Sequence, residues 1–206
     1  GMHFSFALAL ALMLWLAVFI YWSESLRSRV EGLQSLVLLI AAVCAALPAV
    51  FLQTHIVTHA ENWGFKLHFV AAMLAYSLFT LSALHALFMG IVEQRLHSGA
   101  LYRQMSGLPP ILSMERLLFQ MIGVGFALLT VTLGSGILFS EAIFGKKLPF
   151  DHKTVFAFAA WGIFAALLLG RRIYGWRGRI ALRWTLSGFL LLLLAYVGSR
   201  FVSEVL

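Results

Sequence analysis

The stretch Leu67–Val92, LHFVAAMLAYSLFTLSALHALFMGIV, decides what kind of protein this chain forms. It contains no Asp, Glu, Lys or Arg, and apolar side chains fill most of its positions. A helix that crosses a bilayer needs about 20 such residues, because each residue advances the helix by ~1.5 Å. We therefore interpret this stretch as a membrane-spanning helix.

Apolar runs of the same kind recur along the chain. Apolar residues make up 62% of it, charged residues 11%, and the mean hydropathy is +0.94. A soluble domain has roughly 45–50% apolar and about 25% charged residues. Since hydrocarbon satisfies no backbone N–H or C=O group, the spans must be helices or a closed barrel, and the long unbroken apolar runs favour helices. The sequence predicts an all-α, polytopic membrane protein, with residues 1–206 as a single transmembrane domain, one bundle of about six helices. We expect these at about 4–22, 34–52, 67–92, 117–139, 154–170 and 184–202.

The basic residues predict the topology. The net charge is +7, but Lys and Arg lie in short links between apolar runs, which favours a membrane protein over a nucleic-acid-binding one. Ten of the 15 basic residues lie in the first, third and fifth links, and five lie on the other side. The positive-inside rule then makes the odd links cytoplasmic and turns both termini outward. The ten are Arg27, Arg29, Arg95, Arg103, Arg116, Arg171, Arg172, Arg177, Arg179 and Arg183.

The sequence shows no sign of an enzyme. No Walker motif, nucleophile elbow or His-Glu-x-x-His motif occurs. All eight carboxylates lie outside the apolar runs or at their edges, whereas an ion pathway usually needs ionisable groups at mid-bilayer. The single Cys44 forms no internal disulfide, and no Cys-x-x-Cys-His motif attaches haem covalently. We expect no catalytic residues.

Histidines are the candidate ligands. His55, His59 and His68 cluster before and at the start of the third span, and His152 lies in the fourth link, all on the predicted outer side. Imidazole is a good ligand for haem iron and for transition metals. The alternative is that these are ordinary interfacial side chains. His85, inside the third span, is expected to pack inward against another helix.

Two further features favour a pocket near His68. Tyr76 lies eight residues later, about 80° away around a helix axis, so both side chains can border one site. The fourth span is rich in small residues, which allow close helix packing or, alternatively, a flat cofactor against the backbone. These residues are Gly123, Gly125, Gly134, Ser135 and Gly136.

Four segments carry a family resemblance over about two-thirds of the chain. From about Leu67 onward, the chain resembles the cytochrome c assembly family, the CcsA/CcmC-type haem-handling membrane proteins, and is most similar to their YpjD-like and HemX-like branch. The segments are Leu67-His68-Phe69 with Tyr76, PPILSMER at 109–116, GFALLTVTLGSG at 125–136, and GWRGR at 175–179.

This resemblance implies a protein of the bacterial inner membrane that binds haem b non-covalently and positions it at the outer face. His68 matches the external axial ligand, with His152 as the second ligand and His59 as its substitute. Lys146, Lys147 and Arg200 are expected to pair with haem propionates, and Tyr76 to border the site. Asp151 and Lys153 keep the pattern of the family's tryptophan-rich segment. Aromatic side chains expected beside the porphyrin, or in an interfacial belt, are Trp63, Phe69 and Phe150.

The chain also departs from that family. Phe144–Phe150 stands where the tryptophan-rich run belongs, and Gly170, Arg171 and Arg172 occupy the zone of the second external histidine. Two alternatives therefore stay open: a regulatory or scaffold subunit without haem, and an accessory to divalent-metal efflux. The expected partners are the lipid bilayer and other cytochrome c maturation proteins. The Gly1-Met2 start and the apparent lack of earlier helices are read as signs of a fragment.

Overall fold

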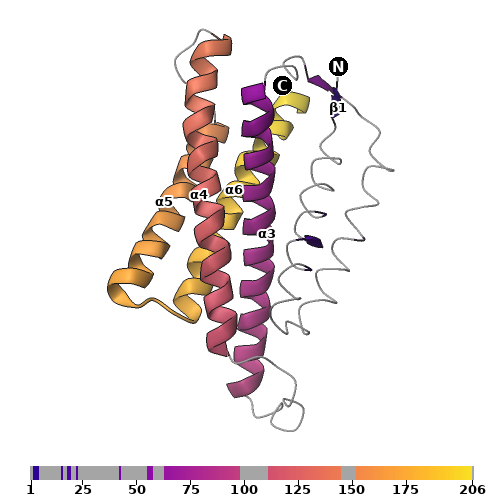
Figure 1. The fold of residues 1–206 in the computed structure, drawn as a ribbon. Helices are drawn as coiled ribbons and strands as arrows, with labels where there is room; N and C mark the ends of the chain where they lie inside the picture. Colours follow the sequence, from indigo (N-terminus) through magenta and orange to yellow (C-terminus); the bar gives the residue numbers. More distant parts are fainter. Residues whose placement is uncertain are drawn as a thin grey trace.

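Four long helices dominate the computed structural model (Figure 1). The structure describes residues 2–4, 15, 18–19, 22, 42, 55–57, 63–97, 111–144 and 152–205. The helices are α3 (Trp63–His97), α4 (Ile111–Phe144), α5 (His152–Tyr174) and α6 (Arg179–Val205). Two short strands, β1 (Met2–Phe4) and β2 (His55–Val57), pair antiparallel.

All four helices are longer than the apolar runs that predict them. Each extends at both ends into polar residues, by two to six residues at the amino end and by three to five at the other. Helix α4 begins at Ile111, directly after Pro110, so Ser113 lies inside it. One expectation is wrong as a result of these longer helices. Arg171 and Arg172 lie in the last turn of α5, where the sequence predicts a link.

The predicted spans 4–22 and 34–52 lie almost entirely outside the described residues. Phe4, expected to begin the first span, is in strand β1, where it pairs with His55. Within the described ranges, three helical segments are long and apolar enough to cross a membrane: Lys66–Gln94, Leu112–Leu138 and His152–Tyr174. The chain is thus a helical membrane protein, while the count of six spans stays a prediction.

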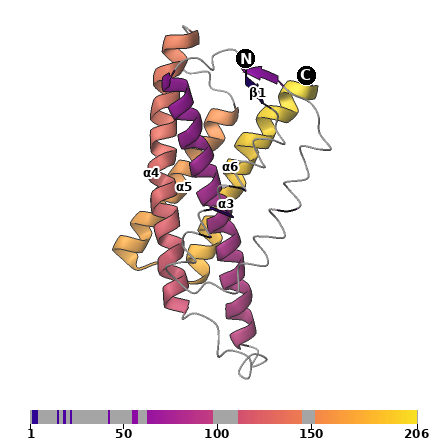
Figure 2. The same ribbon diagram turned by 45° about the vertical axis from the view of Figure 1, so that its right-hand side comes forward.

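The helices form a bundle in which α3 and α4 run antiparallel along their length (Figures 1 and 2). Helix α6 packs against both α5 and α3, and α5 also contacts α4. In both views the start of α3 and the end of α6 lie at one end of the bundle. Exposed apolar side chains cover the outer faces, including Val70, Leu87 and Val131. Such faces suit contact with lipid.

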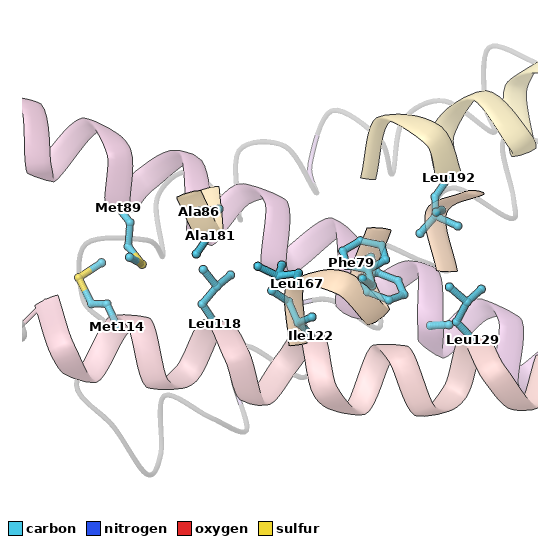
Figure 3. Close-up of a cluster of buried hydrophobic side chains, with 13 residues drawn as sticks. Phe79, Ala86, Met89, Met114, Leu118, Ile122, Leu129, Leu167, Ala181 and Leu192 are labelled. Atoms are coloured by element: carbon cyan, nitrogen blue, oxygen red, sulfur yellow. The ribbon is translucent and has the colours of Figure 1, made fainter. Parts of the chain in front are cut away.

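Two stacked rings join all four helices at the core (Figure 3). Phe79 of α3 and Phe164 of α5 lie with ring centroids 4.0 Å apart and planes 20° apart. Glycines close both sides of the stack: a Cβ added at Gly125 of α4 would lie 3.2 Å from Phe79, and one at Gly188 of α6 would lie 2.7 Å from Phe164. The small residues of α4 thus allow close packing at Gly125, as predicted, whereas Gly123 and Gly134 face open space.

Two ion pairs tie the helices at the opposite end from the start of α3. Arg171 of α5 donates to Glu115 of α4 at 2.6 Å, and Arg179 of α6 donates to Glu93 of α3 at 3.1 Å. The Glu115 side chain is buried, so this ion pair lies inside the bundle.

Candidate functional site

His68 is anchored between the two longest helices. It lies in the second turn of α3, half-buried, and its Nδ1 is 2.8 Å from Oγ of Ser135 on α4. The contact forms because α3 and α4 are antiparallel, so the start of one meets the last turns of the other. A Cβ at the next residue, Gly136, would lie 3.5 Å from Cε1 of the imidazole, so the ring rests close to the α4 backbone.

The hydrogen bonds of the Ser135 hydroxyl favour one tautomer of this imidazole. The hydroxyl proton is directed back along α4, where Oγ donates to the carbonyl of Val131 at 2.7 Å. The serine oxygen then accepts from Nδ1–H of His68. A neutral imidazole with its proton on Nδ1 carries its lone pair on Nε2, the nitrogen that can bind a metal.

Two lysines lie at the same end of the bundle as His68. Lys153, in the first turn of α5, lies near enough for its ammonium to interact electrostatically with His68. The ammonium of Lys66, one turn from the start of α3, lies 5.9 Å from the Trp63 ring centroid. This end of the bundle therefore carries positive charge as well as an imidazole.

The other predicted site residues fall into two groups. His152 begins α5 and is exposed, next to Lys153. Tyr76 lies two turns deeper than His68 and packs against the main hydrophobic cluster. Trp63 is exposed and Phe69 half-buried. His59, Lys146, Lys147, Phe150 and Asp151 lie outside the described residues, as does the side chain of Arg200, although α6 carries it toward the same end of the bundle.

His85 belongs to a different part of the bundle. It is fully buried, and its Nε2 lies 2.9 Å from the carbonyl oxygen of Met114 at the start of α4. This confirms the inward packing expected for a polar side chain within a span. Seventeen residues of helix separate it from His68, about 25 Å along the axis. The two α3 histidines therefore cannot share one ligand.

Two residues near His68 are not predicted as site residues from the sequence. Ser135 stood out only as a small residue, and Lys153 only as part of a pattern. The available signal was the serine between Gly134 and Gly136: a hydroxyl on a strip of helix with no larger neighbours can meet a side chain from another helix. Within the described ranges, no three His, Cys, Asp or Glu side chains gather to hold a metal ion.

Comparison with known proteins places the chain in a family. The family model "Cytochrome C assembly protein" matches residues 2–206. "Inner membrane protein YpjD" of Escherichia coli K12 is 31% identical over 159 residues, which are 77% of this chain and 59% of that protein. A 28.8 kDa protein of Azospirillum brasilense is 35% identical over 68% of this chain and 52% of its own length.

More distant relatives have a stated role. "Cytochrome c biogenesis protein CcsA" of Gloeobacter violaceus is 31% identical over 45% of this chain and 27% of its own length. The chain spans little more than half the length of its first two relatives. No solved structure matches it. With the whole chain covered by the family model, the protein belongs to the cytochrome c assembly family.

Proposed function

We propose that this protein binds haem b without a covalent bond, at the end of the bundle that holds His68, and presents it during cytochrome c assembly. His68 provides one axial ligand through Nε2. In this proposal the protein lies in the bacterial inner membrane, with the His68 end and both termini on the periplasmic side. It acts as an assembly factor beside other maturation proteins, and carries out no catalysis of its own.

The hydrogen bond between His68 and Ser135 carries this proposal. A metal-binding histidine almost always donates its second ring N–H to a fixed acceptor, which orients the ring and selects the tautomer. Ser135 gives His68 this arrangement, at 2.8 Å, from a separate helix. The serine hydroxyl is in turn held by a carbonyl of its own helix, so the acceptor is itself oriented.

The donor set fits a porphyrin better than a bare metal ion. Haem brings four nitrogen ligands of its own, so the protein needs only one or two axial donors. In this proposal His68 provides the first, and the exposed His152 at the start of α5 provides the second. Lys153 can pair with a propionate, together with Lys146, Lys147 and Arg200. Bound haem would supply a redox-active iron, while these residues bind and orient it.

Haem titration of the purified protein tests the proposal. We expect a Soret shift in the wild type that is lost in His68→Ala. Ser135→Ala removes only the acceptor and should weaken haem binding by roughly 10–100-fold, the usual effect of such a partner. The matched control is Ser113→Ala, an exposed serine at the other end of α4, which should bind haem as the wild type does.

Each outcome has a clear meaning. An unchanged Soret shift in His68→Ala removes His68 from the site. Equal affinity in Ser135→Ala and Ser113→Ala refutes the orienting role of Ser135. Purified protein that takes up no haem favours a scaffold or regulatory subunit, to which the altered tryptophan-rich segment at 144–150 also points. Elemental analysis that finds another metal favours the efflux accessory.

A further inference from the structure

The segment that holds α5 and most of α6 is rich in arginine. Residues 152–203 contain no Asp or Glu. Five arginines lie within 13 positions of this segment, at the end of α5, in the turn and at the start of α6. They are Arg171, Arg172, Arg177, Arg179 and Arg183. Any anion that neutralises them must come from another helix or from outside the protein.

Among the described residues, two of the five form ion pairs with neighbouring helices. Glu115 pairs with Arg171 and Glu93 pairs with Arg179. The side chains of the remaining three, Arg172, Arg177 and Arg183, are exposed and form no ion pair with the described part of the chain. Three guanidinium groups without an ion-pair partner on one short segment create a positive potential that attracts phosphate groups.

The turn that carries Arg177 is fixed by its backbone. Gly175 and Gly178 adopt φ values of +65° and +54°, which side chains other than glycine rarely accept. The Trp176 N–H donates to the carbonyl of Gly170 at 3.3 Å, and the indole lies directly on Gly170, where no Cβ would fit. The turn is therefore closed against α5, with Arg177 at its exposed side.

Aromatic rings place this turn at the level of lipid headgroups. Tyr174 stacks with Trp176 at a centroid distance of 6.2 Å, and Trp176 contacts Trp184 at 5.1 Å. Tyr and Trp concentrate at the membrane–water interface, where one part of the side chain meets hydrocarbon and the other meets water. Exposed Ile173 and Ile180 lie beside them and suit contact with acyl chains.

We propose that the α5–α6 turn is a binding surface for anionic phospholipid, with Arg172, Arg177 and Arg183 contacting the headgroup phosphates. All five basic residues here are arginine, whose planar guanidinium binds phosphate through two parallel hydrogen bonds. The surface lies at the opposite end of the bundle from His68. It does not depend on haem binding, and either proposal can fail alone.

Lipid retention tests this surface. The full chain, purified in a neutral detergent, is mixed with phosphatidylglycerol or with phosphatidylcholine of the same acyl chains, and bound lipid is counted by native mass spectrometry. We expect phosphatidylglycerol to be retained in preference. One surface arginine contributes about 1 kcal/mol to binding of anionic lipid, so Arg177→Gln should lower the affinity roughly fivefold. Arg172→Gln/Arg177→Gln/Arg183→Gln should abolish the preference.

Two controls keep the result interpretable. Lys66→Gln removes one exposed cation at the other end of the bundle and should leave lipid retention unchanged. Arg177→Gln alters an exposed, unpaired side chain, so it should fold and take up haem as the wild type does. The proposal is overturned if the triple variant retains phosphatidylglycerol as the wild type does, if both lipids bind equally, or if Lys66→Gln has the same effect as Arg177→Gln.

Discussion

Replacing Arg171 and replacing Glu115, which form a buried ion pair between α4 and α5, should change the free energy of unfolding by very different amounts. Glu115 and Arg171 are 2.6 Å apart, but only 6% of the Glu115 side chain is exposed, against 28% of Arg171. The guanidinium also lies 4.1 Å from the centroid of the Phe119 ring. The carboxylate is therefore the member that depends on its partner, while the guanidinium has a second contact and access to the surface.

The expected magnitudes follow from this asymmetry. Arg171→Met leaves a carboxylate buried without a counter-charge, and breaking such a pair costs about 3 kcal/mol or more of the free energy of unfolding. Glu115→Gln leaves a guanidinium that can reach water or a headgroup, so the cost should be nearer to about 1 kcal/mol, as for partly exposed pairs. Glu115→Leu/Arg171→Met removes both charges and should be close to the wild type, because apolar replacement of a buried pair is often neutral.

Equilibrium unfolding in mixed micelles, followed by far-UV circular dichroism as the share of denaturing detergent rises, measures these free energies. The matched control is the other ion pair, Glu93 with Arg179, whose side chains are 30% and 64% exposed. Arg179→Met and Glu93→Gln should each cost less than about 1 kcal/mol. The reasoning is refuted if Glu115→Gln costs as much as Arg171→Met, or if the control pair is equally sensitive.

Two further substitutions test the packing of the bundle by the same unfolding measurement. Gly188→Ala places a Cβ 2.7 Å from Phe164 and should cost about 1–3 kcal/mol of the free energy of unfolding through overpacking. Its control, Gly162→Ala, meets nothing within 4 Å and should be neutral or stabilising. Equal effects of the two substitutions would contradict the ring stack. His85→Leu loses the hydrogen bond to Met114, but it also removes a buried Nδ1 that has no partner among the described residues. Because these two effects oppose each other, the free energy of unfolding should change by less than about 1.5 kcal/mol. His85→Ala leaves a cavity and should cost about 2–4 kcal/mol, and equal costs for the two would show that Nδ1 is engaged.

The helices of the described region were predictable, but their ends were not. Unbroken apolar runs mark α3, α4, α5 and α6, since length and the absence of charge are enough to indicate a span. The ends extend further because charged residues there find partners. Arg171 continues α5 into its last turn by pairing with Glu115 on another helix, and this pairing depends on a helix–helix register that hydropathy does not contain.

The candidate site was predictable only in part, for a similar reason. His68 can be singled out from its residue type and position, but Ser135 is 67 residues away, and only the antiparallel packing of α3 and α4 brings the two together. Composition also ranks the glycines of α4 equally, whereas the structure distinguishes them. Gly125 and Gly136 face Phe79 and His68, while Gly123 and Gly134 face neither.

Polar side chains have different kinds of partner at the two ends of the bundle, which supports proposing a different function for each end. At the α5–α6 end, carboxylates from α3 and α4 neutralise two arginines, an arrangement that stabilises the helix packing. At the other end, His68 forms a hydrogen bond with the neutral hydroxyl of Ser135. An ion pair there would tie the helices more strongly but would commit the imidazole to its partner. A serine orients the ring without adding a charge, which agrees with the proposed role of His68 as a ligand.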